Sequence, residues 1–277
     1  EEAVRIILSE NRPFSMETAA CDEEYEPSSE YDSSFALQIF AAREAVFKIL
    51  AKESLSIHEK LIVILDMGSK IQQCINTDEY DNIKSVVNDY LKEGIAHTLD
   101  ETRNLSDSGQ FEDISLQQGI RQILYPYEEM EVLNPEWEVI LKDIIDSLFE
   151  QMSDEEYNIL NEEFGTYMVS RAYEYRQLLE YLVFRYFAKS IYDYDFLGKC
   201  QMLVTNFFVI RQMDIIRWLD NHREYSFKDR MDVVHIFSRQ VEYSEDNIEN
   251  LYEDFIFDDI FKTDSLIAIL WIDSENI

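Results

Sequence analysis

Residues 196–219 read FLGKCQMLVTNFFVIRQMDIIRWL, and this stretch decides the fold. Apolar residues occur on most faces of a helix drawn through it, which is the pattern of a helix that is buried on nearly every side. Charged residues interrupt the stretch at four positions: Lys199, Arg211, Asp214 and Arg217. Because a membrane span carries few or no charges, we expect the central helix of a soluble bundle and no membrane insertion.

The composition extends the helical prediction to the rest of the chain. The 277 residues include only 6 glycines and 4 prolines. All-β and α/β proteins need both residues for their many tight turns, so this scarcity favours long helices with few connections. Hydrophobic residues make up 46% of the chain, enough to build a core. We predict an all-α fold, an irregular multi-helix bundle of about ten helices.

Local signals place most of these helices. Apolar residues at three- and four-residue spacing predict a helix over residues 35–52, and weaker patterns predict helices over 79–99 and 115–124. A longer pattern over 157–191 allows two helices, with a break expected near Gly165. Capping signals mark five further helix starts: Ser56 with Glu59, Asn134 with Pro135, Ser153 with Glu156, Ser226 with Asp229, and Ser244 with Asn247.

The two ends of the chain differ in organisation. Residues 1–33 predict a partial helix followed by an acidic surface loop, and residues 34–277 predict the helical domain. A candidate sub-boundary lies near 100–134, where residues 100–114 form a polar connection. The chain begins at Glu1 in a helical pattern and without a methionine, so we expect a fragment of a longer protein.

The charge balance limits the function classes. With 24 basic and 57 acidic residues the net charge is −33. Binding to phosphate groups requires basic patches, so we expect no nucleic-acid partner and no anionic membrane surface. Most of the carboxylates are interpreted as a solvated surface, although an acidic surface also attracts basic partners. No signal peptide is visible, which favours the cytoplasm.

The cysteines do not predict a metal centre. Cys21, Cys74 and Cys200 are far apart in the sequence and odd in number, which is typical of reduced thiols in a cytosolic protein. They lack the close spacing of zinc and iron–sulfur ligands. We predict no bound metal and no cofactor in this chain.

Two other motifs begin like metal sites and are incomplete. Residues 193–198 resemble the start of a calcium loop, but Leu197 and Val204 stand where liganding oxygens are needed. Asp232 and His235 share one helical face, whereas a di-iron bundle needs two such pairs and two further glutamates. A stand-alone helical metal enzyme therefore lacks a ligand set.

Three arginines on otherwise apolar helices are candidate structural or functional cations: Arg211, Arg217 and Arg239. Cations are rare in this chain, and a partly buried arginine needs a carboxylate or carbonyl partner. The alternative is a solvated guanidinium above a packed aliphatic stem.

Four segments in the second half carry a family resemblance: EYLVFRYF (180–187), VIRQMDIIRW (209–218), IFSRQVEYS (236–244) and the acidic helix 246–255. Together they resemble the C-terminal region of the flagellin lysine-N-methylase family, and residues 41–65 are similar to another stretch of it. The sequence departs from the family pattern where Tyr181 follows Glu180 directly and where Tyr243 stands in place of a histidine. The resemblance covers roughly residues 35–75 and 175–255.

The resemblance implies an enzyme that methylates lysine ε-amino groups of flagellin with S-adenosylmethionine. It also implies a cysteine-rich N-terminal part that looks like an iron–sulfur cluster site and is absent from this sequence. We therefore expect a protein-lysine N-methyltransferase as the full-length protein, and a fragment that is inactive alone and scaffolds the site or binds flagellin. On resemblance, Glu180, Tyr181 and Glu242 are the candidate substrate-binding residues.

Two alternatives remain open at the level of sequence. Glu180 and Glu242 can instead pair with arginines in the scaffold. The whole chain can instead be a non-enzymatic helical module for protein–protein interaction. No residue pattern identifies catalytic groups, because the chain shows no Gly-rich phosphate loop and no nucleophile motif.

Overall fold

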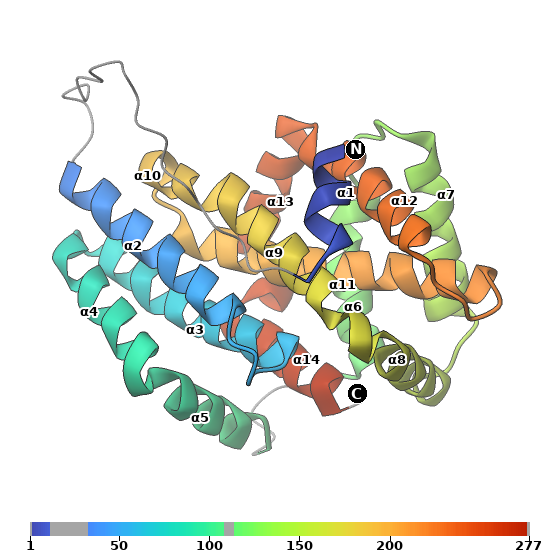
Figure 1. The fold of residues 1–277 in the computed structure, drawn as a ribbon, viewed down its shortest axis with the longest axis horizontal. Helices are drawn as coiled ribbons and strands as arrows, with labels where there is room; N and C mark the ends of the chain where they lie inside the picture. Colours follow the sequence, from blue (N-terminus) through green and yellow to red (C-terminus); the bar gives the residue numbers. More distant parts are fainter. Residues whose placement is uncertain (1, 12–32, 108–113, 276–277) are drawn as a thin grey trace. The chain divides into compact units, whose positions relative to one another are not determined.

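A computed structural model describes residues 2–11, 33–107 and 114–275. These residues form α-helices joined by short turns, and no strand occurs among them (Figure 1). The predicted all-α multi-helix fold is thereby confirmed. The acidic loop expected within residues 10–33 lies almost entirely outside the described part of the chain.

The chain divides into two compact units that alternate along the sequence. The first unit contains residues 1–9, 102–172 and 204–277, and the second contains residues 10–101 and 173–203. Helices α5 (Ile95–Asp107) and α11 (Phe196–Asp220) have residues in both.

The first unit is built around α6. Its helices are α1 (Glu2–Ser9), α6 (Leu116–Glu128), α7 (Pro135–Ile144), α8 (Asp154–Met168), α12 (Phe227–Phe237), α13 (Glu245–Phe257) and α14 (Thr263–Glu275), with the second half of α11. Helix α6 packs against α8, α13 and α14, and α7 packs against α12. Single π-helical turns extend α7 over Ile145–Glu150 and α12 over Ser238–Glu242.

The second unit is built around three mutually packed helices, α2, α3 and α4. Its helices are α2 (Ser33–Leu50), α3 (Ile57–Asn76), α4 (Ile83–Asp89), the start of α5, most of α9 (Ala172–Tyr186) and α10 (Ser190–Asp193). Gly68 lets α3 approach α11 closely, because a Cβ atom at this position would lie 2.5 Å from the Cys200 Sγ atom.

Helix α11 is the central helix that the sequence predicts. Every residue from Gly198 to Ile216 is buried. Its buried charged residues have oppositely charged partners: the Lys199 ammonium lies 2.7 Å from an Asp193 carboxylate oxygen, and Arg211 and Asp214 make the contacts described below. None of the described helices combines the length and the apolar character needed to cross a membrane.

All five predicted helix starts are confirmed. At α3, the Ser56 hydroxyl accepts a hydrogen bond from the Glu59 amide at 3.2 Å, and the Glu59 carboxylate accepts one from the Ser56 amide at 2.8 Å. The same reciprocal pair opens α8 and α12. Asn134 caps α7 ahead of Pro135, and Ser244 caps α13. Each such cap contributes about 1 kcal/mol.

Two expectations about helix ends are wrong. The polar connection expected from residue 100 is helical as far as Asp107, because Trp271 of α14 anchors it: the indole donates to the Thr102 hydroxyl at 3.2 Å, and Arg103 lies over the ring. The two helices expected over residues 157–191 are present as α8 and α9, but the break between them lies later than Gly165. Helix α8 runs through this buried glycine and gives way to a 3₁₀ turn only at residues 169–171.

Candidate functional site

The predicted substrate-binding residues fall in different units. Glu180 and Tyr181 lie on α9 in the second unit, and Glu242 lies in the π-helical turn after α12 in the first. Glu180 is buried and pairs with Arg176 at 3.4 Å, which is the scaffold contact that the sequence left open as its alternative. Tyr181 is half-buried, and its hydroxyl accepts a hydrogen bond from Arg185 at 2.9 Å. Glu242 is buried.

The three candidate cations have different surroundings. Arg211 is buried, donates to the Asn161 carbonyl at 3.1 Å and lies 3.7 Å from the Asp273 carboxylate. Arg239 is exposed, and Arg217 is half-buried. Arg217 also lines a cavity.

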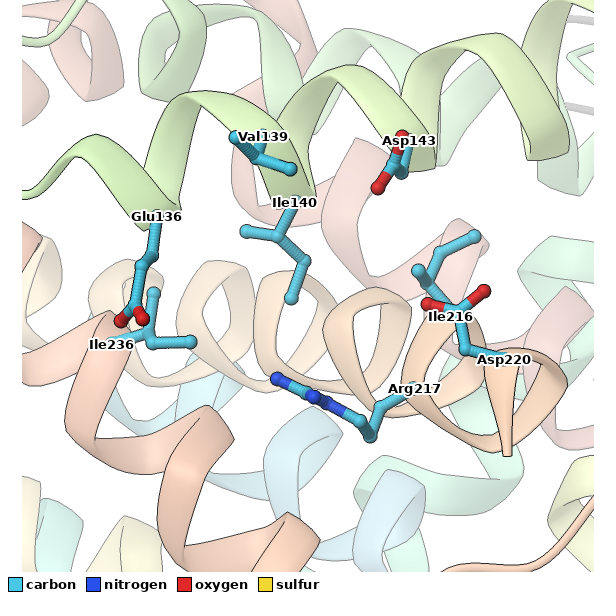
Figure 2. A pocket seen from close by; sticks show the side chains of 8 residues that line it. All are labelled: Glu136, Val139, Ile140, Asp143, Ile216, Arg217, Asp220 and Ile236. Atoms are coloured by element: carbon cyan, nitrogen blue, oxygen red, sulfur yellow. The ribbon is translucent and has the colours of Figure 1, made fainter.

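This cavity is a groove in the first unit, about 240 Å³ in volume, between α7, the end of α11 and α12 (Figure 2). Its apolar part is lined by four side chains: Val139, Ile140, Ile216 and Ile236. Its polar part is lined by three carboxylates and one guanidinium: Glu136, Asp143, Asp220 and Arg217. We call this site the acidic groove.

Helical spacing explains why α7 lines the acidic groove. Glu136, Ile140 and Asp143 are separated by four and then three residues, so they share one face of the helix. The start of α7 is held in place by Gln240, whose side-chain oxygen accepts hydrogen bonds from the Leu133 and Asn134 amides at 2.9 and 3.2 Å. The position of Glu136 therefore depends on a buried glutamine far along the chain.

The opposite side of the groove is fixed by a buried ion pair. Arg230 on α12 donates to the Asp214 carboxylate on α11 at 2.5 Å, and both side chains are fully buried. The Tyr225 hydroxyl donates to the other Asp214 oxygen, and the Arg230 guanidinium lies over the Tyr225 ring. These contacts hold α12, which carries Ile236, against α11, which carries Ile216 and Asp220.

The two ends of the acidic groove differ in charge. Figure 2 shows Asp143 and Asp220 at one end, while the Arg217 guanidinium extends away from them toward the end with Glu136 and Ile236. Among the described residues, neither Asp143 nor Asp220 has an ion-pair partner within 4.0 Å; the neighbouring Lys142 interacts electrostatically with Asp143 but pairs with Asp146. Asp220 is the last residue of α11, so the negative end of the helix dipole adds to the potential there.

A second polar cluster lies in the second unit around Asp66. Its carboxylate accepts hydrogen bonds from Lys70 at 3.0 Å, from Thr98 at 2.8 Å and from Tyr90. Burial, together with Asp66, raises the pKa of Tyr90 to about 12. The pKa of Lys70 is raised as well, because hydrogen bonds to Tyr90 and Asp66 outweigh its burial. Tyr90 and Lys70 therefore stay protonated near neutral pH.

Among the described residues no three histidine, cysteine or acidic side chains gather as metal ligands. Cys74 and Cys200 are buried free thiols, and Cys21 lies outside the described part of the chain. Burial raises the pKa of both thiols, well above the usual range for Cys200.

The acidic groove was missed by the sequence reading, except for Arg217. The facing helices that complete the groove cannot be paired from one sequence. Two segments that carry the family resemblance contribute to it: residues 209–218 supply Ile216 and Arg217, and residues 236–244 supply Ile236.

The fold and this site define a class of protein: an all-helical, strongly acidic domain that carries a small groove lined by aliphatic and carboxylate side chains. A comparison with family models matches residues 43–269 to the FliB lysine N-methylase C-terminal domain. The chain belongs to this family. No match to this chain was found among the curated proteins or among the solved structures.

Proposed function

We propose that this chain is the helical C-terminal portion of a flagellin lysine-N-methylase, and that it scaffolds or binds the substrate while methyl transfer takes place elsewhere in the full-length protein. The observation that carries the proposal is the family match over residues 43–269. S-adenosylmethionine would supply the methyl group, and flagellin is the proposed partner.

The chemistry of lysine methylation favours an acidic binding surface. The ε-amino group of lysine is a cation at neutral pH and must be neutral to accept a methyl group. Carboxylates attract this cation before it is deprotonated, and tyrosine rings add cation–π contacts. The net charge of −33 and the 17 tyrosines support such a role. Of the three residues predicted on resemblance, the half-buried Tyr181 has the most accessible side chain, and all three stay predictions.

The cysteines of this chain do not fit an iron–sulfur cluster. Such a cluster takes four thiolate ligands, whereas the sequence contains three cysteines. Burial keeps Cys74 and Cys200 in the thiol form by raising their pKa. The cluster implied by the family resemblance would therefore be held outside these residues, and no step is assigned to it.

Two assays test the proposal. The full-length protein, incubated with S-adenosylmethionine and unmethylated flagellin, is expected to produce methyl-lysine detectable by mass spectrometry. A protein that methylates no flagellin lysine would refute the function. Deletion of residues 175–255 is expected to abolish methylation. Full activity after this deletion would refute the role of the helical portion. Capture of flagellin by the 277-residue chain tests that role directly.

A further inference from the structure

We propose that the acidic groove binds one lysine side chain of the protein substrate, with the ε-ammonium between Asp143 and Asp220 and the methylenes over Ile140 and Ile216. The proposal rests on the proposed function, because it names the surface at which this chain holds its substrate.

The acidic groove has the size of a single amino-acid side chain and not of a cofactor. Pockets that enclose cofactors and drug-sized molecules measure about 300–1,000 Å³. The groove is smaller, at about 240 Å³, and is open to solvent along the exposed residues Glu136, Val139 and Asp143. It therefore suits a single long side chain presented from a protein surface.

The lining matches a lysine side chain, because apolar residues lie where its stem would lie and carboxylates where its ammonium would lie. Ile140, Ile216 and Ile236 are buried beneath the groove and offer aliphatic contact to a four-carbon stem. Asp143 and Asp220 stand at one end, both exposed and, among the described residues, without an ion-pair partner within 4.0 Å. An entering ammonium would be their ion-pair partner, further favoured by the dipole of α11.

Arg217 makes the two ends of the acidic groove electrostatically different. Its guanidinium extends toward Glu136 and away from Asp220 (Figure 2). A second cation is repelled from the Glu136 end, whereas the Asp143 and Asp220 end stays negative. Glu136 and Asp143 are seven residues apart on α7, or about 10 Å along the helix axis at 1.5 Å per residue. This separation leaves room for an extended side chain along α7 between Glu136 and Asp143.

Binding to the full-length protein tests the proposal. The variant Asp143→Asn/Asp220→Asn removes two charges from the acidic groove. Its matched control, Glu138→Gln/Glu249→Gln, removes two charges from exposed positions on α7 and α13 outside the groove. The probes are unmethylated flagellin, a short peptide with one lysine, and the same peptide with norleucine in place of lysine. Affinities are measured by calorimetry at low and high salt.

We expect the groove variant to bind flagellin and the lysine peptide about tenfold more weakly than wild type, and the control to bind within twofold. The lysine peptide should bind more tightly than the norleucine peptide, with a difference that shrinks at high salt. Equal binding by wild type and the groove variant overturns the inference while leaving the proposed function intact. If wild type binds no flagellin, the proposed partner is wrong, and the two peptides alone then test the groove. Equal affinity for the lysine and norleucine peptides would overturn the inference that the groove binds lysine.

Discussion

Replacing Arg230 by methionine should strongly destabilise the first unit. Methionine keeps much of the side-chain length but removes the charge that neutralises the fully buried Asp214. Removing one partner of a buried ion pair costs about 3–5 kcal/mol, because the remaining charge stays desolvated. The Tyr225 hydroxyl also donates to Asp214 and offsets only part of this cost.

The assay is urea unfolding followed by tryptophan fluorescence. The chain has three tryptophans, and all lie in the first unit: Trp137, Trp218 and Trp271. Their emission therefore reports on the unit that carries the ion pair. We expect the free energy of unfolding to fall by about 3–5 kcal/mol. At roughly 2–4 °C per kcal/mol for a chain of this size, the melting temperature should fall by about 6–20 °C.

Two further variants separate the buried charge from general damage. Lys142→Met breaks an exposed ion pair with Asp146 and should leave the free energy of unfolding nearly unchanged. Asp214→Leu/Arg230→Met removes both buried charges and should recover a large part of the stability that Arg230→Met loses. A cost below about 1 kcal/mol for Arg230→Met, or no recovery in the double variant, would refute the reasoning.

Three smaller effects follow from local geometry. Ser56→Ala should lower stability by about 1 kcal/mol in urea unfolding followed by far-UV circular dichroism, which reports on the helices of both units, through loss of the α3 cap; an unchanged midpoint contradicts this. Gly68→Ala should cost about 1–3 kcal/mol, because its Cβ meets the Cys200 sulfur, and adding Cys200→Ala should return part of that cost in the same assay. The stabilisation contributed by Tyr90 and Lys70 should be fully present near neutral pH and be lost between pH 10 and 12, since the folded state raises the pKa values of both groups above their unfolded values; a Tyr90→Phe protein whose stability falls equally steeply over this range would exclude Tyr90 as a cause.

Local signals predicted most of the fold because they act over a few residues. The caps at Ser56, Asn134 and Ser226 require only a side chain and an amide within one turn, so the sequence alone identifies them. The apolar run of α11 similarly identifies its own burial. The end of α5 was missed because the partner that stabilises it, Trp271, lies 169 residues from Thr102.

The candidate site was predicted less well for the same reason. Glu136 and Asp143 look like ordinary surface carboxylates of an amphipathic helix. They become part of a site only because Gln240 holds the start of α7 and Arg230 holds α12 against α11. Glu180 was selected on resemblance, and its pairing with Arg176 on the preceding turn is local. Such pairing shows that a conspicuous buried charge can have a structural partner close by.

Steady-state methylation of flagellin by the full-length protein tests the central claim, that this helical portion contributes substrate binding. For Asp143→Asn/Asp220→Asn we predict a KM for flagellin about tenfold above wild type with kcat within twofold, because lost binding that is equal in the ground and transition states raises KM alone. The Glu138→Gln/Glu249→Gln control should match wild type in both constants. An unchanged KM in the groove variant, or a loss confined to kcat, would contradict the account.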